Sequence, residues 1–396
     1  MRKKILLVDT WSVGWNFFKP VILELRSITN CDVYFLHGNS FYSPDCNVGE
    51  GEEFVTFIDI RDIRYDISGF IRLEKFDFAI FISVHDVFHR WVNECLSRES
   101  IPVFMFMHGV RVSNSSKKVR VKKPMSLMVD RFYFYLRQSF FIFKSEFKEG
   151  PLLFLMAFFP VVESLLRYRS FKKNPVFKYW GCTYTLIFMN TIDDLVYFEK
   201  FLGAKASQTV FKESGNVLSS QAAIVAASKY QPVEKSVLFF SQPFYNGGSI
   251  SLANWLAFVS EVRFVFIEAG YNFNVRPHPA DSKEYVSLIE ELGCHVTQVD
   301  LSTDLSRTAV VVGVNSAALI GAITAGFSTL VIDVSFADSL PINIDRYPNA
   351  IRCEFSVADS VSGVIQDLER LRGTTTPVRD VLSPSSFIAA EIRKNS

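Results

Sequence analysis

Residues 236–279 read SVLFFSQPFYNGGSISLANWLAFVSEVRFVFIEAGYNFNVRPHP, and this stretch decides the fold class. It holds an apolar run at Val237–Phe240, a loop rich in turn residues, a helix-length segment at Ser251–Ala269 and a second apolar run at Asn272–Val275. Short apolar runs on either side of a helix predict a βαβ unit with parallel strands. Such strands are buried on both faces of their sheet, which indicates the α/β class.

The alternation of strands and helices continues towards the C-terminus. Strands are expected at His295–Val299, Ala309–Val312 and Thr329–Ile332, and helices at Ser282–Leu292 and Val357–Leu371. We therefore predict a Rossmann-like domain over residues 235–396.

The N-terminal half has a similar pattern and predicts another Rossmann-like domain over residues 1–230. Its expected strands are Ile5–Val8, Asp32–Leu36, Phe54–Ile58, Phe76–Ile82, Pro102–Met107, Thr185–Met189 and Ser207–Phe211, and its expected helices are Gly14–Thr29, Asp86–Glu99, Ile192–Phe201 and a segment around Ser219–Ser228. The peptide KYQPVEK at Lys229–Lys235 is interpreted as the linker. Ligands of open α/β sheets bind at the carboxyl ends of the strands, so two such domains are expected to face a cleft.

Between about residues 111 and 175 the α/β pattern is interrupted by a segment rich in Phe and basic residues, which we interpret as a helical insertion into the N-terminal domain. Residues 111–123 hold six basic residues and no acidic one. Basic residues beside apolar helices favour peripheral contact with an anionic inner membrane, and packing of the Phe side chains in a core or an oligomer interface is the alternative. The uncharged run Gly150–Val162 is too short to cross a bilayer, which takes ~20 residues.

The composition excludes several classes of protein. The chain has 396 residues and a net charge of +1, from 42 Lys and Arg against 41 Asp and Glu, so no nucleic-acid partner is expected. Its six cysteines are scattered, without a CxxC pair or metal-ligand spacing, which favours a reducing cytoplasm and no metal site. The first apolar run ends at Asp9 and is too short for a signal peptide. We expect a cytoplasmic protein.

The peptide Arg276-Pro277-His278-Pro279 follows a predicted strand directly. Its two prolines stiffen the turn and direct His278 away from the sheet. A His held at the carboxyl end of a strand can bond to a phosphate or protonate a leaving oxygen, and Arg276 adds a guanidinium that suits phosphate. A capping turn whose His packs against a neighbour is the alternative.

A second strand-to-helix turn begins at Gly313. Gly313 permits close backbone approach, and Asn315 or Ser316 can cap the following helix. The free N–H groups at that helix start suit an anion, with the Ser316 hydroxyl assisting. The alternative is an ordinary helix cap.

Three further loops follow predicted strands. Ser241 and Gln242 open the loop after Val237–Phe240 and are candidate ligand contacts. His108, after Pro102–Met107, is a candidate general base or anion contact, and a half-buried His whose bonds are satisfied within the protein is the alternative. Glu213 is the best carboxylate candidate for a base, although a surface glutamate is the more common occurrence.

Several motifs are absent from the sequence. It contains no GxxxxGK[ST], no GxGxxG after the first strand, no GxSxG and no DxD-type triplet. Phosphoryl transfer by a P-loop, NAD or FAD binding and a metal-dependent sugar-nucleotide site are therefore not expected.

These residues together resemble GT-B glycosyltransferases of bacterial surface-polysaccharide assembly. The HG after the first unit's core strands, the SQP that opens the second unit, RPHP and NSAAL carry the resemblance, which is closest to sialyltransferases and Kdo transferases that use CMP-activated sugars. In that group an HP motif and a downstream Ser motif hold CMP. The resemblance implies that His278 and Pro279 form the HP motif and that Ser316 contacts the phosphate. The acidic-acidic-Gly motif of such sialyltransferases is replaced here by Glu213-Ser214-Gly215.

The resemblance implies metal-free, inverting transfer from a nucleotide sugar to a glycan or lipid-linked glycan of the capsule or lipopolysaccharide. The C-terminal domain would hold the donor and the N-terminal domain the acceptor, with His278, Ser316 and Arg276 offsetting phosphate charge and Glu213 or His108 taking the acceptor proton. The paired HG and HP motifs also resemble CDP-glycerol transferases. A nucleotide-sugar epimerase and a binding protein without chemistry are the alternatives outside transferases.

Overall fold

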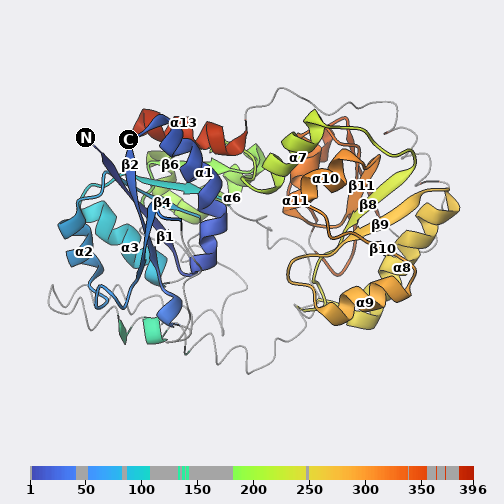
Figure 1. Cartoon of the computed structure of the whole chain (residues 1–396), viewed down its shortest axis with the longest axis horizontal. Coiled ribbons are helices and arrows are strands. Elements are labelled where there is room, and N and C mark those ends of the chain that lie inside the picture. Colours follow the sequence, from blue (N-terminus) through green and yellow to red (C-terminus); the bar gives the residue numbers. More distant parts are fainter. Residues whose placement is uncertain are drawn as a thin grey trace. The chain divides into compact units, whose positions relative to one another are not determined.

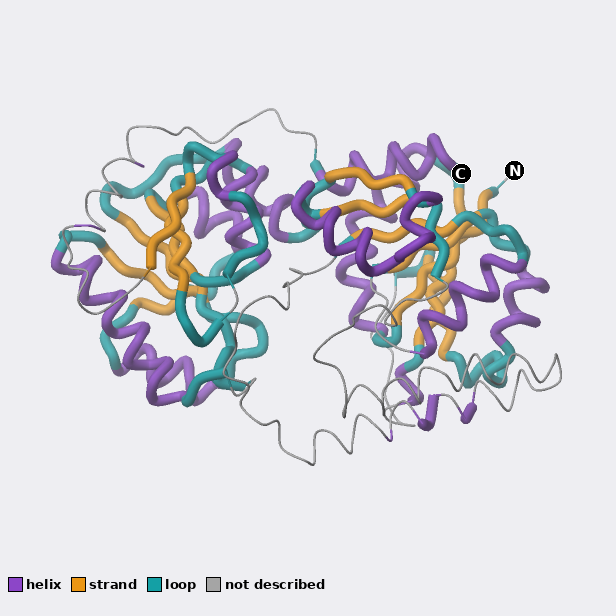
Figure 2. Tube along the Cα trace, turned by 180° about the vertical axis from the view of Figure 1, so that it is seen from behind, coloured by secondary structure: helices purple, strands orange, loops and turns teal. Residues whose placement is uncertain are grey.

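The computed structural model describes residues 2–41, 52–82, 87–107, 182–246, 249–337, 339–354 and 383–396, together with residues 133, 136–138, 140, 141, 363 and 371. The described chain forms two compact units. The first runs to Ser214 and takes in 385–396, and the second runs from Gly215 to Pro384. Each unit is a parallel sheet between helices (Figures 1 and 2).

The sheet of the first unit has the strand order β3-β2-β1-β4-β5-β6-β7. Its elements are β1 (Lys3–Asp9), α1 (Trp15–Ile28), β2 (Cys31–His37), β3 (Val55–Asp59), α2 (Ile67–Glu74), β4 (Phe78–Phe81), α3 (Val87–Arg98), β5 (Val103–Phe106), β6 (Leu186–Met189), α6 (Leu195–Leu202), β7 (Val210–Glu213) and α13 (Pro384–Asn395). All neighbouring strands pair in parallel.

The second unit has a six-stranded sheet in the order β10-β9-β8-β11-β12-β13. Its elements are α7 (Ser219–Ser228), β8 (Ser236–Phe240), α8 (Leu252–Glu268), β9 (Asn272–Arg276), α9 (Lys283–Glu291), β10 (His295–Val296), α10 (Leu301–Ser306), β11 (Val310–Gly313), α11 (Ala317–Thr324), β12 (Thr329–Asp333) and β13 (Ala350–Glu354). Numbered within the unit, this order is 3-2-1-4-5-6, the order of a Rossmann fold. The predicted fold class, two Rossmann-like α/β domains, is confirmed.

Alternating side chains of the strands build the two cores of the second unit. Val237 and Phe239 of β8 lie in a cluster with α8 and α9, whereas Leu238 and Phe240 lie in a cluster with α7, α10 and α11. Successive strand residues point to opposite faces, so a run of apolar residues fills both cores at once. This is why the continuous runs in the sequence predicted buried parallel strands.

The chain passes between the units at Ser214 and Gly215, and not at the predicted linker Lys229–Lys235. The helix α7, which the sequence assigned to the N-terminal domain, packs against α10 and α11. Gly321 of α11 permits this packing, because a Cβ there would lie 2.8 Å from the backbone of Ser219. The helix α13 returns to the first unit, where Phe387 contacts Phe188 of β6.

The sequence did not predict four elements: α2, α10, β13 and α13. The predicted insertion over 111–175 and the predicted helix Val357–Leu371 lie outside the described residues except for single positions. Among these, Phe141 stacks on Tyr65 of the first unit with ring centroids 4.6 Å apart. No helix in the described part of the chain is long and apolar enough to span a bilayer.

Candidate functional site

Most of the residues predicted to bind the nucleotide-sugar donor lie at the carboxyl edge of the second sheet. His278 follows β9, Gln242 follows β8, and Ser316 follows β11. Because β9 and β11 are the two neighbours of β8, their ends lie about 10 Å apart across β8, twice the strand spacing. The direction of strand order reverses at β8, and ligands of such sheets bind at that point.

His278 is held in a tight turn with one ring nitrogen left over. The Asp281 N–H donates to the His278 carbonyl at 2.8 Å, which closes a four-residue turn with Pro279 at the position that proline favours. The Ala280 N–H donates to Nδ1 of His278 at 3.1 Å. Nε2 has no hydrogen-bond partner among the described residues. Burial lowers the pKa of His278, against a smaller opposite effect of the Asp281 carboxylate, so the ring is neutral at pH 7.

Asp281 and Tyr245 connect the His278 turn to the loop after β8. One Asp281 oxygen accepts from the His278 backbone N–H at 2.8 Å, and the other accepts from the Tyr245 hydroxyl at 3.2 Å. The same hydroxyl accepts from the Ser282 N–H at 3.2 Å, and the Asn246 amide donates to the Ala280 carbonyl at 3.0 Å. The turn is therefore braced from a neighbouring loop.

Ser316 caps α11, as the sequence predicted. Its Oγ accepts from the Ala318 N–H at 3.1 Å, and its backbone is extended, as at most helix starts. Gly313 lies at the end of β11, where a Cβ would sit 3.3 Å from the Phe240 carbonyl oxygen and 3.0 Å from Leu319. Asn315 is half-buried beside the cap. The start of α11 therefore presents a hydroxyl and helix N–H groups at the edge of the sheet.

Ser241 lies in the core rather than on the edge. It is 1% exposed, and its hydroxyl bonds to the Tyr285 hydroxyl at 2.7 Å, which in turn accepts from the Trp255 indole N–H at 3.0 Å. Gln242, the next residue, is half-buried, and its amide has no hydrogen bond to any residue the structure describes. Of the two predicted residues in this loop, Gln242 is the one with a free polar group.

The Arg276 guanidinium bonds to the protein itself. Its Nη1 lies 2.5 Å from an Asp304 oxygen and donates to the Val299 carbonyl at 2.6 Å. The other Asp304 oxygen accepts from the Thr297 hydroxyl at 2.6 Å. These contacts tie α10 to the ends of β9 and β10, a structural role that the sequence did not indicate. A contact of Arg276 with phosphate stays a prediction.

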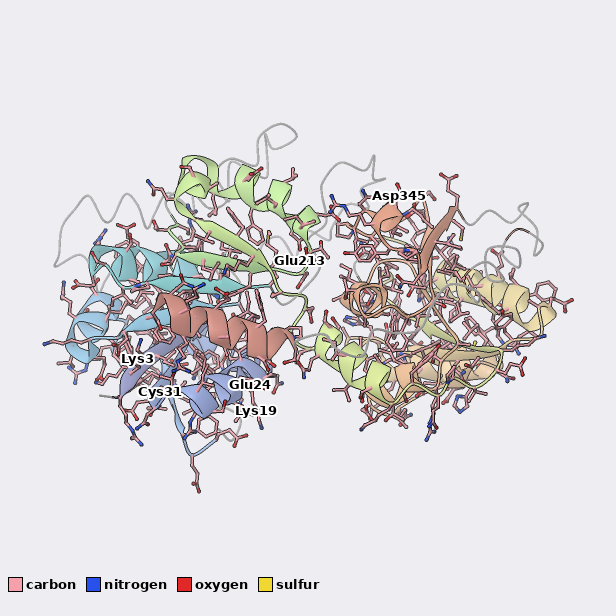
Figure 3. All side chains as sticks on the ribbon, turned by 90° about the horizontal axis from the view of Figure 1, so that it is seen from above. Lys3, Lys19, Glu24, Cys31, Glu213 and Asp345 are labelled. Atoms are coloured by element: carbon pink, nitrogen blue, oxygen red, sulfur yellow. The ribbon has the colours of Figure 1, made fainter. Side chains whose placement is uncertain are left out.

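The two predicted bases belong to the first unit. Glu213 is the last residue of the edge strand β7 and is exposed (Figure 3). It pairs in register with Met189 of β6. His108 lies outside the described residues.

The first unit contains a buried polar cluster that the sequence did not predict. His89, from α3, bonds to Asp9 through Nε2 and to the Thr10 hydroxyl through Nδ1, both at 3.2 Å. All three residues are at most 8% exposed. Asp9 also lies against Gly14, where a Cβ would sit 2.2 Å from its carboxylate. The position of Asp9 after an apolar run was a signal, but no spacing in the sequence links it to His89.

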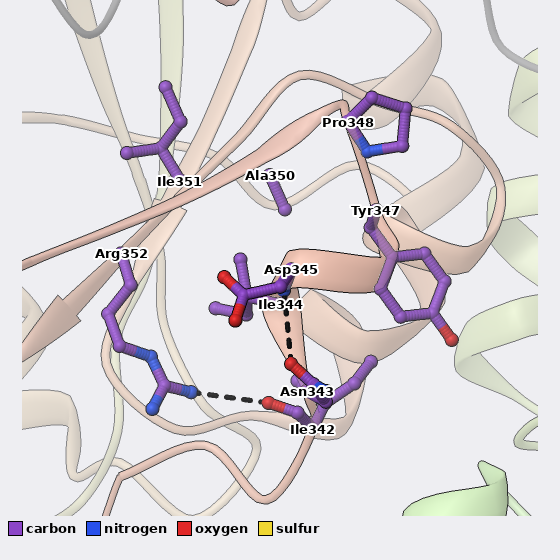
Figure 4. Close-up of a pocket in the computed structure, with 9 residues that line it drawn as sticks. All are labelled: Ile342, Asn343, Ile344, Asp345, Tyr347, Pro348, Ala350, Ile351 and Arg352. Carbon is purple, nitrogen blue, oxygen red and sulfur yellow. Dashed lines mark hydrogen bonds between the residues drawn. The ribbon is translucent and has the colours of Figure 1, made fainter.

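A cavity of about 530 Å³ lies away from these residues (Figure 4). Its lining comes from residues 342–345, 347 and 348 and from Ala350, Ile351 and Arg352 of β13. The Arg352 guanidinium there donates to the Leu340 carbonyl at 2.9 Å and lies 3.6 Å from Asp333. None of the predicted site residues lines this cavity. Within the described residues, no group of three or more His, Cys, Asp or Glu is placed to hold a metal ion.

Comparison with known proteins gives structural neighbours only. No protein-family model and no curated protein sequence matches the chain. The structure of apo UGT2 from Phytolacca americana is similar with a TM-score of 0.50 at 13% identity, over 99% of this chain and 99% of that chain. The calicheamicin glycosyltransferase CalG4 gives a TM-score of 0.48 at 12% identity over 99% and 98% of the two chains, and UDP-N-acetylglucosamine 2-epimerase from Rickettsia bellii gives 0.46 at 14% over 100% and 95%.

At these identities the similarity shows the fold alone. The correspondence with UGT2 extends over both units, and each unit has the Rossmann strand order. The chain therefore has the two-unit GT-B fold that its sequence predicted.

Proposed function

We propose that the chain is a metal-independent glycosyltransferase that moves a sugar from a nucleotide-activated donor to a cell-surface glycan. The observation that carries the proposal is a pair of polar groups at the edge of the second sheet whose chemistry suits an anion. These are the free Nε2 of His278 and the Ser316-capped start of α11, on loops that follow the two neighbours of β8. The phosphate of a nucleotide-sugar donor between these loops would accept hydrogen bonds from the His278 ring and from the start of α11.

The charges at this edge favour a donor with one phosphate. His278 is neutral at pH 7, and Ser316 and Gln242 carry no charge. The Arg276 charge is paired with Asp304, and the Asp281 carboxylate adds a negative charge beside His278. A CMP-linked sugar carries a single negative charge on its phosphodiester, whereas a nucleoside diphosphate sugar carries two. Neutral hydrogen-bond donors and the start of a helix can offset one negative charge without a metal ion. We therefore propose a CMP-activated donor. The resemblance to CMP-sugar transferases, and not this charge count, leads us to propose sialic acid or a related ulosonic acid as the sugar, whose carboxylate is a further charge outside the phosphate.

The proposed reaction is a direct displacement at the anomeric carbon. The acceptor oxygen forms the new bond as the bond from the anomeric carbon to the phosphate oxygen breaks, and the electron pair leaves with CMP. The configuration at that carbon inverts. His278, Ser316 and the start of α11 stabilise the charge that develops on the leaving phosphate.

The acceptor hydroxyl must also lose its proton. Glu213 and His108 remain the proposed candidates for the base. We propose that the acceptor is a capsule or lipopolysaccharide glycan, reached at the inner membrane through the basic, Phe-rich segment 111–175. A CDP-glycerol-type transfer is the alternative within this fold, and it differs by requiring a diphosphate donor.

A thermal-shift screen with CMP, CDP, UDP and GDP tests the donor. A ligand that binds only the folded chain stabilises it by about 2.7 kcal/mol at one hundred times its Kd. We expect CMP to raise the melting temperature and the three diphosphates to have little effect. A shift with CDP or UDP in place of CMP would replace the proposed donor, and no shift with any nucleotide would contradict a nucleotide-sugar transferase.

The variant His278→Ala tests the site. We expect loss of the CMP shift and of sugar transfer, with an unchanged melting temperature of the free protein. His295→Ala is the matched control, because His295 is exposed in the same unit. Wild-type CMP release by His278→Ala in the presence of donor and acceptor would show that the site assignment is wrong.

A further inference from the structure

We propose that Tyr245 and Asp281 form a positioning unit that holds His278 as a neutral imidazole with its proton on Nε2, and that the donor phosphate accepts a hydrogen bond from that N–H. The phosphate contact rests on the proposed function, and the state of the imidazole does not. Neither Tyr245 nor Asp281 touches the donor in this proposal. Both act through His278.

The backbone decides which ring nitrogen carries the proton. A backbone N–H is always a donor, so the 3.1 Å contact from the Ala280 N–H requires Nδ1 to be an acceptor. The proton of the neutral ring must then lie on Nε2, which has no partner among the described residues. An imidazolium would place two donors face to face at Nδ1. The observed turn is therefore incompatible with a charged His278.

Asp281 and Tyr245 hold that turn in place. The Asp281 carboxylate and backbone bond to both the N–H and the C=O of His278, so the carboxylate sets the backbone from which the ring projects. Tyr245 donates to the other carboxylate oxygen, and burial raises the pKa of Tyr245, so it stays protonated at neutral pH. Because Tyr245 lies on the loop after β8, the pair connects two of the three loops of the site.

The groups that face His278 define the expected pH dependence. Asp281, in the same turn, is the charged group that acts on the ring, and Tyr245 faces the turn from the loop after β8. The Arg276 charge, at the end of β9, is paired with Asp304 on α10. If the neutral His278 ring donates the hydrogen bond, the affinity for the phosphodiester is expected to be constant above about pH 6.5. Below the pKa of His278 it is expected to fall by up to tenfold per pH unit. A cationic phosphate clamp predicts the reverse, an affinity that falls as the pH rises.

Two-bond ¹H–¹⁵N spectra of the full chain test the state of the ring directly, with His278→Gln used to assign its signals. We expect the pattern of the Nε2–H tautomer at pH 7, with and without nucleotide. In Asp281→Ala we expect the signals to shift towards a mixture of tautomers. An Nδ1–H tautomer or an imidazolium in the wild type at pH 7 would overturn the proposal, whatever the chain binds.

The binding experiment uses the methyl ester of CMP, a phosphodiester that does not itself titrate near pH 6. Its affinity is measured by calorimetry between pH 5.5 and 8 for the wild type, Asp281→Ala and Tyr245→Phe. We expect about tenfold weaker binding for Asp281→Ala and about fivefold weaker binding for Tyr245→Phe. His278→Gln, whose amide nitrogen can replace Nε2–H, should retain more affinity than His278→Ala.

Matched controls separate positioning from general stability. Asp66→Ala removes a loop carboxylate that accepts the Gly69 N–H in the first unit, and Tyr230→Phe removes a half-buried hydroxyl in the second. We expect both to bind like the wild type. Affinity that rises as the pH falls, or equal losses in the controls, would overturn the positioning unit. A chain with the Nε2–H tautomer that binds no cytidine phosphodiester would instead contradict the proposed donor.

Discussion

At the residue scale, three histidines of this chain differ in what their two ring nitrogens contact. Both nitrogens of His89 bond within the protein, to Thr10 and Asp9. His37 is fully buried at the end of β2, with Nδ1 3.4 Å from Asp59. Its Nε2 has no hydrogen-bond partner among the described residues. His278 also has one fixed and one free nitrogen, but it is half-buried at the edge of the second sheet rather than enclosed in the core. The residue type alone therefore predicts no role, and the partners and the exposure of each ring decide it.

His37 makes the stability of the first unit depend on pH. Burial lowers the pKa of His37, against a smaller opposite effect of Asp59, so the unfolded chain binds more protons than the folded one between this pKa and about 6.5. Its contribution to stability is complete above about pH 6.5 and is lost as the pH falls. We expect His37→Leu to flatten the decrease in denaturation midpoint between pH 7 and 5. His295 is exposed, so His295→Leu should leave the decrease in denaturation midpoint as it is in the wild type. The same decrease in His37→Leu as in the wild type would show that His37 does not cause the pH dependence.

Gly321 tests close packing at a single residue. A Cβ at this position would lie 2.8 Å from backbone atoms of Ser219, which cannot move as a flexible side chain can. We expect Gly321→Ala to cost about 1–3 kcal/mol in the free energy of unfolding, measured by urea denaturation. Gly363→Ala is the control, since no atom lies within 4 Å of a Cβ there. An unchanged stability in Gly321→Ala would mean that α7 and α11 separate freely.

At the element scale, Arg276 and Asp304 tie a short helix to two strands. The carboxylate side chain is 9% exposed and the guanidinium side chain 26%, so removal of Arg276 leaves a nearly buried charge. We expect Arg276→Met to cost roughly 2 kcal/mol, below the about 3–5 of a fully buried pair because the guanidinium is partly solvated. Adding Asp304→Leu should restore most of that loss, as shown by a double-mutant cycle in urea.

The double variant also separates the two roles of Arg276. If the guanidinium only holds α10, the stable Arg276→Met/Asp304→Leu chain will bind CMP like the wild type. Stability restored without CMP binding would show that Arg276 also contacts the phosphate, as the sequence predicted.

At the scale of the whole molecule, the C-terminal helix belongs to the unit that begins the chain. Ile388 and Ile392 of α13 are fully buried in the first unit, and Glu391 bonds to Lys212 of β7 at 2.5 Å. We expect Ile388→Ala to destabilise the first unit by about 2–5 kcal/mol. Calorimetry should then show one transition shifted to lower temperature and a second, raised by CMP, that is not shifted.

The control for this prediction is Val196→Ala, at a position of α6 that is 70% exposed, which should change neither transition. If Ile388→Ala lowered the CMP-sensitive transition as well, the two units would not unfold separately.

The fold class, the strands and the local turns follow from the amino-acid sequence alone. The apolar runs of β8, β9 and β11 lie within a residue or two of their predicted bounds, because a buried parallel strand requires apolar residues on both faces. The Ser316 cap and the Pro279 turn were also predictable, because their hydrogen bonds join residues at most three positions apart.

Contacts between residues far apart in the sequence depend on how the whole chain folds. Asp281 bonds to Tyr245 across 36 positions, Arg276 to Asp304 across 28, and His89 to Asp9 across 80, and no local pattern encodes these pairings. The unit boundary was misplaced for the same reason. The helix α7 is ordinary in sequence, and its membership depends on a glycine in α11, about a hundred residues further along the chain, that leaves room for its backbone.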